Sequence, residues 1–395
     1  MQRRGNRCAA HKLLQSLWEN SRSSVLRLVE VFHMAVSISD ERRTDKVGDL
    51  DEELRKILES RKAEIKVVGC GGSGGNTISR LMQVGIVGAE TIAVNTDAQD
   101  LLYTDSDRKV LIGKEITGGL GAGADPKVGM ESAKESKEDI KRSLEGADMV
   151  FISCGLGGGT GTGSSPIVAD IAKKLGALTV GIVTLPFSME GKQRFRNAQE
   201  GLENLESVVD TLIVIPNDKL LEIVPDVSIT TAFKVADEIL VNAVKGIAEL
   251  ITKPGLVNLD FADVRAVMGS GGLAMIGMGE SDTESRAVES VEKALNNPLL
   301  DVEINGAIGA LVNVSGGSDI TIKECQEIVD GVSSRINPDA KIIWGAQVIK
   351  ELGDTIRAML IITGVKSSQI YGPEKTFTLE KQKEIEKVLG IDFVS

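Results

Sequence analysis

A run of closely spaced glycines constrains this chain more than any other feature of its sequence. It reads Gly-Leu-Gly-Gly-Gly-Thr-Gly-Thr-Gly over residues 155–163 and directly follows the apolar run 149–153. Glycine lets a backbone approach an anion closely with positive φ at several positions, and N–H groups at a helix start attract anions. Residues 164–174 show helical spacing of apolar side chains, with Pro166 in the expected first turn. The pattern of strand, glycine loop and helix predicts a phosphate-binding cradle rather than a flexible linker.

Composition narrows the class of protein. The 395 residues suit two domains, and a content of 42% hydrophobic and 26% charged residues is typical of a soluble globular protein. A net charge of −12 and only 3% aromatic residues disfavour a nucleic-acid partner. No apolar run is long enough to span a membrane, so we expect no direct membrane insertion. The four cysteines show no paired metal spacing, which indicates a reduced, cytoplasmic protein without a protein-held metal.

The N-terminal region differs in charge from the rest of the chain. Up to His33 it carries six Lys and Arg residues against two acids. This basic start fits either a membrane-surface helix or a segment foreign to the native protein, which would then begin at Met34. Residues 49–62 follow as a predicted amphipathic helix. Both histidines of the chain, His11 and His33, lie in this region, so histidine-dependent triads and metal sites are excluded from the body of the protein.

From Ala63 onward, apolar runs alternate with polar helical segments. This order predicts a doubly wound parallel sheet, in which ligands bind beyond the C-terminal ends of the strands. A long helix is predicted from Ser228 to Lys253, and its apolar residues recur on more than one face, so we expect it to be buried between two bodies. Four strands and two helices then predict a smaller α+β body with its helices on one face.

A second glycine motif lies near the start of the predicted sheet. Gly-Cys-Gly-Gly-Ser-Gly-Gly-Asn at 69–76 follows a strand and formally matches G-x-G-x-x-G, with Asp97 at the end of the next strand. This match makes an NAD-dependent Rossmann oxidoreductase an alternative. Two phosphate cradles at neighbouring strand ends suit a triphosphate better than one pyrophosphate, and no G-x-x-x-x-G-K-[ST] motif of the P-loop NTPases occurs.

Taken together, these motifs resemble the FtsZ branch of the tubulin/FtsZ GTPases, in its archaeal form. The resemblance covers roughly residues 61–365, and its most specific segment is the Gly-Gly-Gly-Thr-Gly-Thr-Gly signature at 157–163. The supporting segments are 69–76, Asn95-Thr-Asp97, Pro186-Phe-x-x-Glu-Gly-x-x-Arg194, Ile215-Pro-Asn217, Ala232-Phe-x-x-Ala-Asp237 and Asn258-x-Asp-Phe-Ala-Asp263. The chain departs from the bacterial pattern in lacking a long linker and a clear terminal anchor peptide.

The resemblance implies a set of residues that bind the nucleotide. The phosphates would be held by Gly72, Ser73, Gly74, Gly75, Asn76, Gly158, Gly159, Thr160 and Gly161, the sugar and phosphate side by Glu190 and Arg194, and the base by Phe233 and Asp237, with Asn217 as a further nucleotide-binding residue. Residues four apart lie on one face of a helix, so Phe233 can stack on a purine while Asp237 accepts from adjacent donors of guanine. Adenine offers an acceptor there, which predicts preference for GTP. The alternatives are a core aromatic and a helix-surface acid.

The same resemblance implies catalysis between subunits. From Asp237 to Lys253 the helix advances about 24 Å at ~1.5 Å per residue. Asp260 and Asp263 follow that helix, so as catalytic residues they must act on the nucleotide of a neighbouring copy, with Asn258 positioning their loop. A head-to-tail contact that does not close into a ring gives a filament. The alternative is that these acids cap the helix that begins near Asp260.

We therefore expect a GTP-hydrolysing cell-division protein that polymerises head-to-tail at mid-cell into the cytokinetic ring. It would use GTP/GDP and Mg²⁺, its partners would be further copies of itself and membrane-anchoring division proteins bound through its tail, and a non-hydrolysing cytoskeletal filament remains a further alternative. The expected parts are an N-terminal extension and helix (1–60), a GTP-binding domain (61–228), a central helix (229–257), a GTPase-activating domain (258–365) and a tail (366–395).

Overall fold

A computed structural model of the chain describes residues 63–223, 228–253, 256–257, 260–269, 271–300 and 306–365. The extension and helix expected at 1–60, the tail at 366–395 and Asn258 lie outside these described residues. No described helix is long and apolar enough to cross a membrane.

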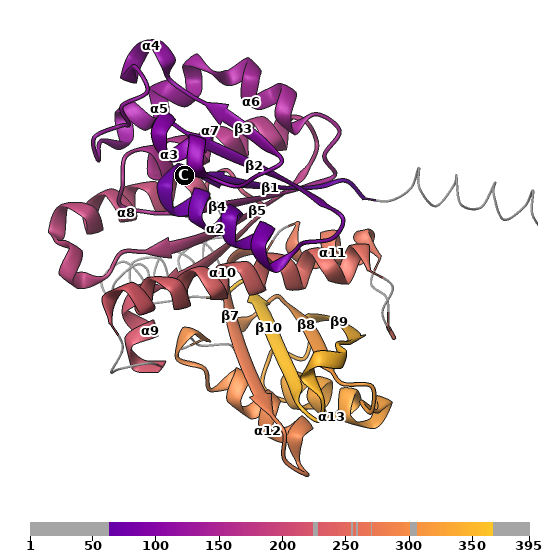
Figure 1. Cartoon of the computed structure of the whole chain (residues 1–395). Coiled ribbons are helices and arrows are strands. Elements are labelled where there is room, and N and C mark those ends of the chain that lie inside the picture. Colours follow the sequence, from indigo (N-terminus) through magenta and orange to yellow (C-terminus); the bar gives the residue numbers. More distant parts are fainter. Residues whose placement is uncertain are drawn as a thin grey trace, which may run out of the picture. The chain divides into compact units, whose positions relative to one another are not determined.

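A mostly parallel sheet forms the centre of the fold (Figure 1). Its first six strands run parallel in the order β3-β2-β1-β4-β5-β6, which confirms the predicted doubly wound sheet. Strands β1, β4, β5 and β6 are buried on both faces, which explains their nearly continuous apolar sequences, whereas the edge strand β3 is partly exposed. The strands are β1 (Ile65–Cys70), β2 (Ala89–Asn95), β3 (Arg108–Leu111), β4 (Met149–Gly155), β5 (Leu178–Leu185) and β6 (Thr211–Pro216).

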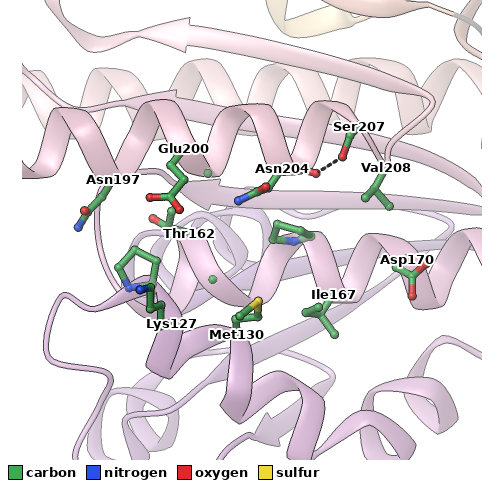
Figure 2. A pocket seen from close by; sticks show the side chains of 14 residues that line it. Lys127, Met130, Thr162, Ile167, Asp170, Asn197, Glu200, Asn204, Ser207 and Val208 are labelled. Carbon is green, nitrogen blue, oxygen red and sulfur yellow. Dashed lines mark hydrogen bonds between the residues drawn. The ribbon is translucent and has the colours of Figure 1, made fainter. Parts of the chain in front are cut away.

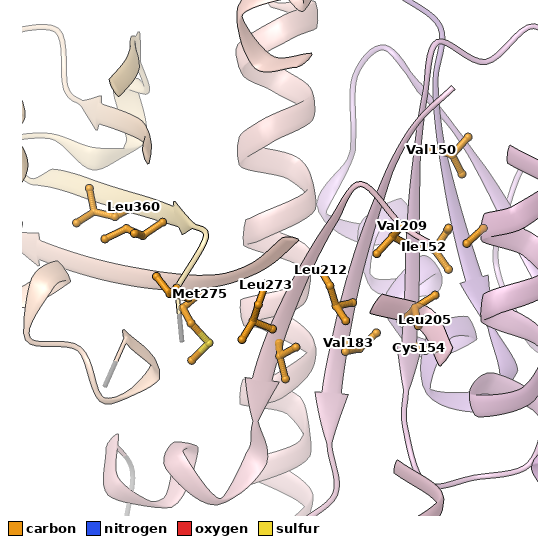
Figure 3. Packing of buried hydrophobic residues seen from close by; sticks show 14 of the residues in the cluster. Val150, Ile152, Cys154, Val183, Leu205, Val209, Leu212, Leu273, Met275 and Leu360 are labelled. Atoms are coloured by element: carbon orange, nitrogen blue, oxygen red, sulfur yellow. The ribbon is translucent and has the colours of Figure 1, made fainter. Parts of the chain in front are cut away.

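Helices cover both faces of this sheet, because successive side chains of a strand point to opposite sides. In β4, Val150 and Ile152 belong to the hydrophobic cluster beneath α7 and α8, part of which Figure 3 shows, whereas Met149 and Phe151 belong to the cluster beneath α2 and the central helix. The helices are α2 (Gly71–Val84), α3 (Ala98–Tyr103), α4 (Lys114–Thr117), α5 (Pro126–Glu135), α6 (Lys137–Leu144), α7 (Thr160–Lys174), α8 (Lys192–Glu206) and α9 (Asn217–Ile223), with a 3-10 turn η1 (Ser188–Glu190).

The long central helix α10 (Ile229–Thr252) joins the two halves of the described fold. It contacts α2 and β5 of the first half, and β8 and β9 of the second. Leu240, Val244 and Ile247 are fully buried along it, which confirms the predicted burial between two bodies. Ser228 caps its start, where the hydroxyl accepts a hydrogen bond from the N–H of Thr231 at 3.2 Å.

The second half contains the predicted four strands and two main helices. β7 and β8 each pair antiparallel with β10, and β8 pairs parallel with β9. The parallel pairing of β6 with β7 over three residue pairs makes one continuous sheet of both halves, a join that the sequence does not predict. The elements are α11 (Phe261–Met268), β7 (Gly272–Ser281), α12 (Arg286–Leu295), η2 (Pro298–Leu300), β8 (Gly309–Gly316), α13 (Ile322–Ser333), β9 (Lys341–Val348), η4 (Lys350–Leu352) and β10 (Ile356–Thr363).

Candidate functional site

A cavity of about 300 Å³ lies at the C-terminal ends of β1, β4 and β5. Both glycine motifs reach it, and the second and third turns of α10 and residues from η1, α8 and α9 complete its wall. This is the edge where ligands bind in doubly wound sheets. Predicted site residues that line the cavity are Gly72, Ser73, Gly158, Gly159, Thr160, Gly161, Glu190, Arg194, Asn217, Phe233 and Asp237.

Two helices begin inside the glycine motifs. Helix α7 starts at Thr160 rather than at the predicted Ser164, so Pro166 lies in the helix interior and not in the first turn. Helix α2 likewise starts within its motif, at Gly71. Within the described chain, neither helix start has a side-chain cap, in contrast to α3 and α5, which Asp97 and Asp125 cap. The first-turn N–H groups of α2 and α7 are therefore left for a ligand, and the positive ends of both helix dipoles favour an anion.

Most glycines of the two motifs serve close packing rather than an unusual backbone conformation. Positive φ, expected at several positions, occurs in these motifs at Gly71 (+72°) and Gly157 (+103°). A Cβ at Gly163 would lie 2.0 Å from the carbonyl oxygen of Pro126, so α5 and α7 touch through backbone there. At Gly158 no atom lies within 4 Å of an added Cβ, so this position faces open space at the cavity.

Three predicted phosphate-binding residues do not line the cavity. A Cβ at Gly74 would lie 2.6 Å from the carbonyl oxygen of Ser153, and at Gly75 it would lie 3.1 Å from Oγ1 of Thr104. Both glycines are buried against neighbouring elements, and Asn76 is exposed outside the cavity lining. These three residues lie at the end of the first turn and in the second turn of α2, where the backbone has moved away from the helix N-terminus, which explains why the motif contributes only its first residues.

Phe233 and Asp237 stand together on α10 at the cavity. The Phe233 ring is 42% exposed and meets the Phe187 ring edge-on, with centroids 5.2 Å apart, so it is not a core aromatic. Burial raises the pKa of the Asp237 carboxyl to about 6, although the nearby Arg80 guanidinium acts in the opposite direction. Asp237 is therefore mainly ionised at neutral pH, and an N–H donor in the cavity would favour this charged form further.

Of the polar side chains on the remaining wall, Glu190 already has partners within the protein, whereas Asn217 has an oxygen without one. Glu190 forms an ion pair with Arg194 and accepts a hydrogen bond from the N–H of Phe187 at 2.9 Å. Asn217 is buried, and its Oδ1 has no hydrogen-bond partner among the described residues. Because a buried acceptor without a donor is costly, this amide fits a ligand that supplies an N–H or O–H group.

Several residues at or beside the cavity were not among the predicted site residues. Phe187 does not line the cavity but meets the Phe233 ring edge-on, and its place directly after a strand, in the segment Pro186-Phe-x-x-Glu, was a signal that could have assigned it. Cys70 and Cys154 end adjacent strands beneath the glycine motifs, and burial raises the pKa of both thiols, that of Cys154 to about 12. They therefore remain protonated and are not nucleophiles. The other lining residues not predicted are Gly71, Gly155, Leu156, Thr184, Pro186 and Ala236.

The two predicted catalytic acids lie away from this cavity. Asp260 is the N-cap of α11, with its Oδ1 accepting from the N–H of Asp263 at 2.8 Å, so its capping role is observed. Both side chains are exposed, and neither lines the cavity. From Asp237 the remaining fifteen residues of α10 advance about 22 Å before α11 begins at the end opposite α9 (Figure 1). Asn258 lies outside the described residues and stays a prediction.

Two known protein families match this chain, one over each half of the described fold. The model of the Tubulin/FtsZ family GTPase domain matches residues 64–225, and that of the FtsZ family C-terminal domain matches residues 272–366. Cell division protein FtsZ of Methanothermobacter thermautotrophicus is 59% identical over 86% of this chain and 91% of its own length. Cell division protein FtsZ 1 of Methanocaldococcus jannaschii is 61% identical over 85% of this chain and 91% of its own length.

Solved structures agree with this match. An empty FtsZ dimer from M. jannaschii is 62% identical, with a TM-score of 0.77 over 80% of this chain and 92% of that chain. A GTPγS-bound protofilament of CetZ2 from Haloferax volcanii shares the fold, with a TM-score of 0.69 at 20% identity, over 80% of this chain and 99% of that one. These matches give no support to an oxidoreductase or to a filament that does not hydrolyse nucleotide.

Proposed function

Because the chain belongs to the FtsZ family of tubulin-like GTPases, we propose that it is a GTP-hydrolysing cell-division protein whose filaments form the cytokinetic ring at the division site. The observation that carries this proposal is the cavity that two uncapped helix starts line together with Phe233 and Asp237. Its parts match the parts of a purine nucleoside triphosphate, because the helix starts offer N–H donors for phosphates and α10 offers an aromatic ring and a carboxylate for a base.

Within the cavity, the first turns of α2 and α7 would bind the phosphates. Phe233 would stack on the base, with its ring fixed by Phe187, and Asp237 would accept from two N–H donors of guanine. Asn217 Oδ1, which is buried and unpaired among the described residues, would accept from a base or sugar donor. Adenine would place an acceptor against the Asp237 carboxylate, so discrimination in favour of GTP is expected.

Magnesium would be held mainly by phosphate oxygens. The described residues contain no group of three or more His, Cys, Asp or Glu side chains that could hold a metal ion, and Mg²⁺ sites on nucleotides commonly rely on the phosphates with few protein ligands. When bound, the ion would offset the charge that develops on the phosphates during hydrolysis.

Hydrolysis is proposed to take place between two subunits. Asp260 and Asp263 are exposed at the far end of α10, where a second copy stacked head-to-tail would present its nucleotide to them. There the carboxylates would orient the attacking water and accept its proton. In this assembly residues 61–228 act as the GTP-binding domain, residues 229–257 as the central helix and residues 258–365 as the activating domain. Membrane-anchoring division proteins would bind the tail at 366–395.

The test is whether hydrolysis depends on assembly. Phosphate release and light scattering are measured after GTP is added to the whole chain at increasing protein concentration, with ATP as the control nucleotide. We expect turnover per subunit to rise with concentration for GTP and to stay low for ATP. Asp263→Ala should still bind GTP and form filaments but hydrolyse slowly. Turnover per subunit that does not change with concentration would contradict catalysis between subunits, and near-UV titration showing NADH binding would favour the oxidoreductase instead.

A further inference from the structure

A second cavity, of about 340 Å³, lies between helices α5, α7 and α8, outside the nucleotide cavity (Figure 2). Its apolar lining includes Met130, Ile167 and Val208, and its charged residues are Lys127, Asp170 and Glu200. A cavity of this volume with an apolar lining and a few polar groups has the general character of a small-molecule site. None of the roles proposed above uses it.

Two polar residues of this cavity hold the glycine motif that leads into the nucleotide cavity. The Thr162 hydroxyl oxygen accepts from the N–H of Gly157 at 2.9 Å, and the Asn197 amide donates to the carbonyl oxygen of the same Gly157 at 3.4 Å. Asn197 also donates to the carbonyl oxygen of Ala124 at 3.2 Å, which ties α8 to the segment before α5. Gly157 has φ of +103° and directly precedes Gly158, which lines the nucleotide cavity. An occupant that displaces Thr162 or Asn197 must therefore move the backbone that would receive the phosphates.

One carboxylate of this cavity, that of Glu200, is available to a cation. Asp170 already pairs with Lys174 at 2.6 Å, whereas Glu200 is exposed and has no ion pair within the part of the chain that the structure describes. Figure 2 shows the Glu200 side chain directed toward the cavity, above Thr162 and Met130. Because Lys174 offsets Asp170, the charges left at the cavity are Glu200 and Lys127, and Glu200 is the carboxylate that a bound cation can pair with. An ammonium group beside Glu200 with an apolar body on Met130 and Ile167 satisfies both features.

We propose that this cavity is an effector site for a small amphipathic amine, and that its occupancy is coupled to the nucleotide cavity through Gly157. The coupling rests on the nucleotide site proposed above, whereas binding of the amine does not. Coupling of two ligands is reciprocal, so a nucleotide that changes the Gly157 backbone changes the affinity for the amine by the same factor. The site would thus let a small cationic molecule adjust nucleotide exchange without entering the nucleotide cavity.

Binding is tested first, on the whole chain without nucleotide. Methionine methyl groups carry ¹³C, and 2-phenylethylamine is titrated while NMR follows the Met130 methyl signal, assigned with Met130→Leu. 2-Phenylethanol, of similar shape but uncharged, is the control ligand. We expect the amine to shift the Met130 signal with an affinity about two- to fivefold higher than that of the alcohol, because only the amine pairs with the exposed Glu200. Equal affinities, or no shift of Met130 with the amine, would overturn the proposal.

A matched pair of variants tests whether Glu200 is the carboxylate that pairs with the amine. Glu200→Gln should reduce amine affinity to that of the alcohol, while Glu206→Gln, on the same helix but outside the cavity lining, should leave it unchanged. Equal losses in both variants would mean that general surface charge, and not the cavity, attracts the amine. A Glu200→Gln variant that binds the amine as the unmodified chain does would overturn the assignment of Glu200.

Coupling is tested second, by measuring GDP affinity with and without saturating amine. We expect a change of about fivefold or more in the unmodified chain, none in Glu200→Gln, and the same factor when amine affinity is measured with and without GDP. An unchanged GDP affinity alongside amine binding would overturn the coupling. Failure of GDP to bind at all would instead contradict the proposed function, and the Met130 titration would still decide whether the cavity binds amines.

Discussion

At the scale of single residues, Asp237 combines a candidate role in recognition with a cost in stability. Burial raises the pKa of its carboxyl to about 6, against an ordinary value of 3.8. The folded state therefore holds this proton more tightly than the unfolded chain, so the contribution of Asp237 to stability declines as pH rises from about 4 to 6 and stays unfavourable above that range. Because the ionised carboxylate of Asp237 lowers the stability of the fold, a role in binding a ligand explains its half-buried position better than a role in folding does.

Asp237→Asn should therefore have opposite effects on stability and on nucleotide binding. Without nucleotide, the variant should be more stable than the unmodified chain at about pH 7.5, by on the order of 1 kcal/mol after allowance for partial exposure, and the difference should vanish near pH 4. Its preference for GTP over ATP should fall, because the amide no longer accepts two N–H groups as a carboxylate does. Thermal unfolding at both pH values and competition binding are the measurements.

Asp282→Asn, an exchange at an exposed aspartate of the second half, serves as the control for this prediction. It should change neither unfolding temperature nor nucleotide preference. An Asp237→Asn variant that is less stable than the unmodified chain at neutral pH, and that discriminates GTP from ATP equally well, would contradict both halves of the argument.

The sequence predicts residues well where spacing alone decides the geometry. Phe233 and Asp237 lie four residues apart, so any helix through them puts both on one face, and the structure has them together at the cavity. Gly74 and Gly75 were less predictable, because a glycine that faces a ligand and one that faces Ser153 or Thr104 have the same sequence signal. The unpaired Asn217 Oδ1 also depends on which groups surround it after folding, and no local pattern encodes that.

At the scale of elements, the two types of glycine should respond differently to one added methyl group. Gly163→Ala would place a Cβ 2.0 Å from the carbonyl oxygen of Pro126, so α5 and α7 must move apart. We expect a loss of stability of about 1–3 kcal/mol, measured by denaturant unfolding. Gly158→Ala meets no atom within 4 Å, so its stability should stay near that of the unmodified chain, while GTP affinity falls because the methyl enters the cavity. Equal stability losses in both variants would contradict this division.

The α11 helix allows capping to be separated from catalysis at Asp260. Asparagine is as good an N-cap as aspartate, so Asp260→Asn should keep the bond to the Asp263 N–H and the unfolding temperature. Asp260→Ala should lose about 1 kcal/mol of stability with the cap. If the carboxylate takes part in hydrolysis, both variants should release phosphate slowly. Full turnover in Asp260→Asn would assign Asp260 to capping alone.

Element positions were predictable where apolar runs are long, as in β1, β4, β5, β6 and α10, because burial on both faces leaves a continuous signal. The start of α7 was misplaced because glycine is a poor helix former, and only close contact with α5 explains why helix begins among glycines. The β6–β7 pairing involves three residue pairs between segments far apart in the chain. Local sequence patterns do not predict such long-range strand pairings.

At the scale of the whole molecule, assembly requires a face that can bury apolar surface at the end that carries α11. Leu256 is 59% and Ile308 62% exposed there. Leu256 donates its N–H to Ala346 of β9, and Ile308 donates its own to Thr363 of β10, so both backbones are fixed while their side chains face outward. Exposed apolar side chains on a rigid surface are typical of an interface.

We therefore expect Ile308→Asp to block GTP-dependent filaments and to lower turnover per subunit roughly tenfold or more, with GDP affinity unchanged. Ile322→Asp is the matched control, because Ile322 is 80% exposed at the first position of α13, where an acid suits the helix dipole. It should assemble and hydrolyse GTP normally. Leu256→Asp provides a second variant in case Ile308→Asp does not fold. Sedimentation measures filament formation and phosphate release measures turnover, both on the same samples. Variants that stay monomeric yet hydrolyse GTP at the full rate would show that one subunit carries a complete active site, and catalysis between subunits would then be wrong.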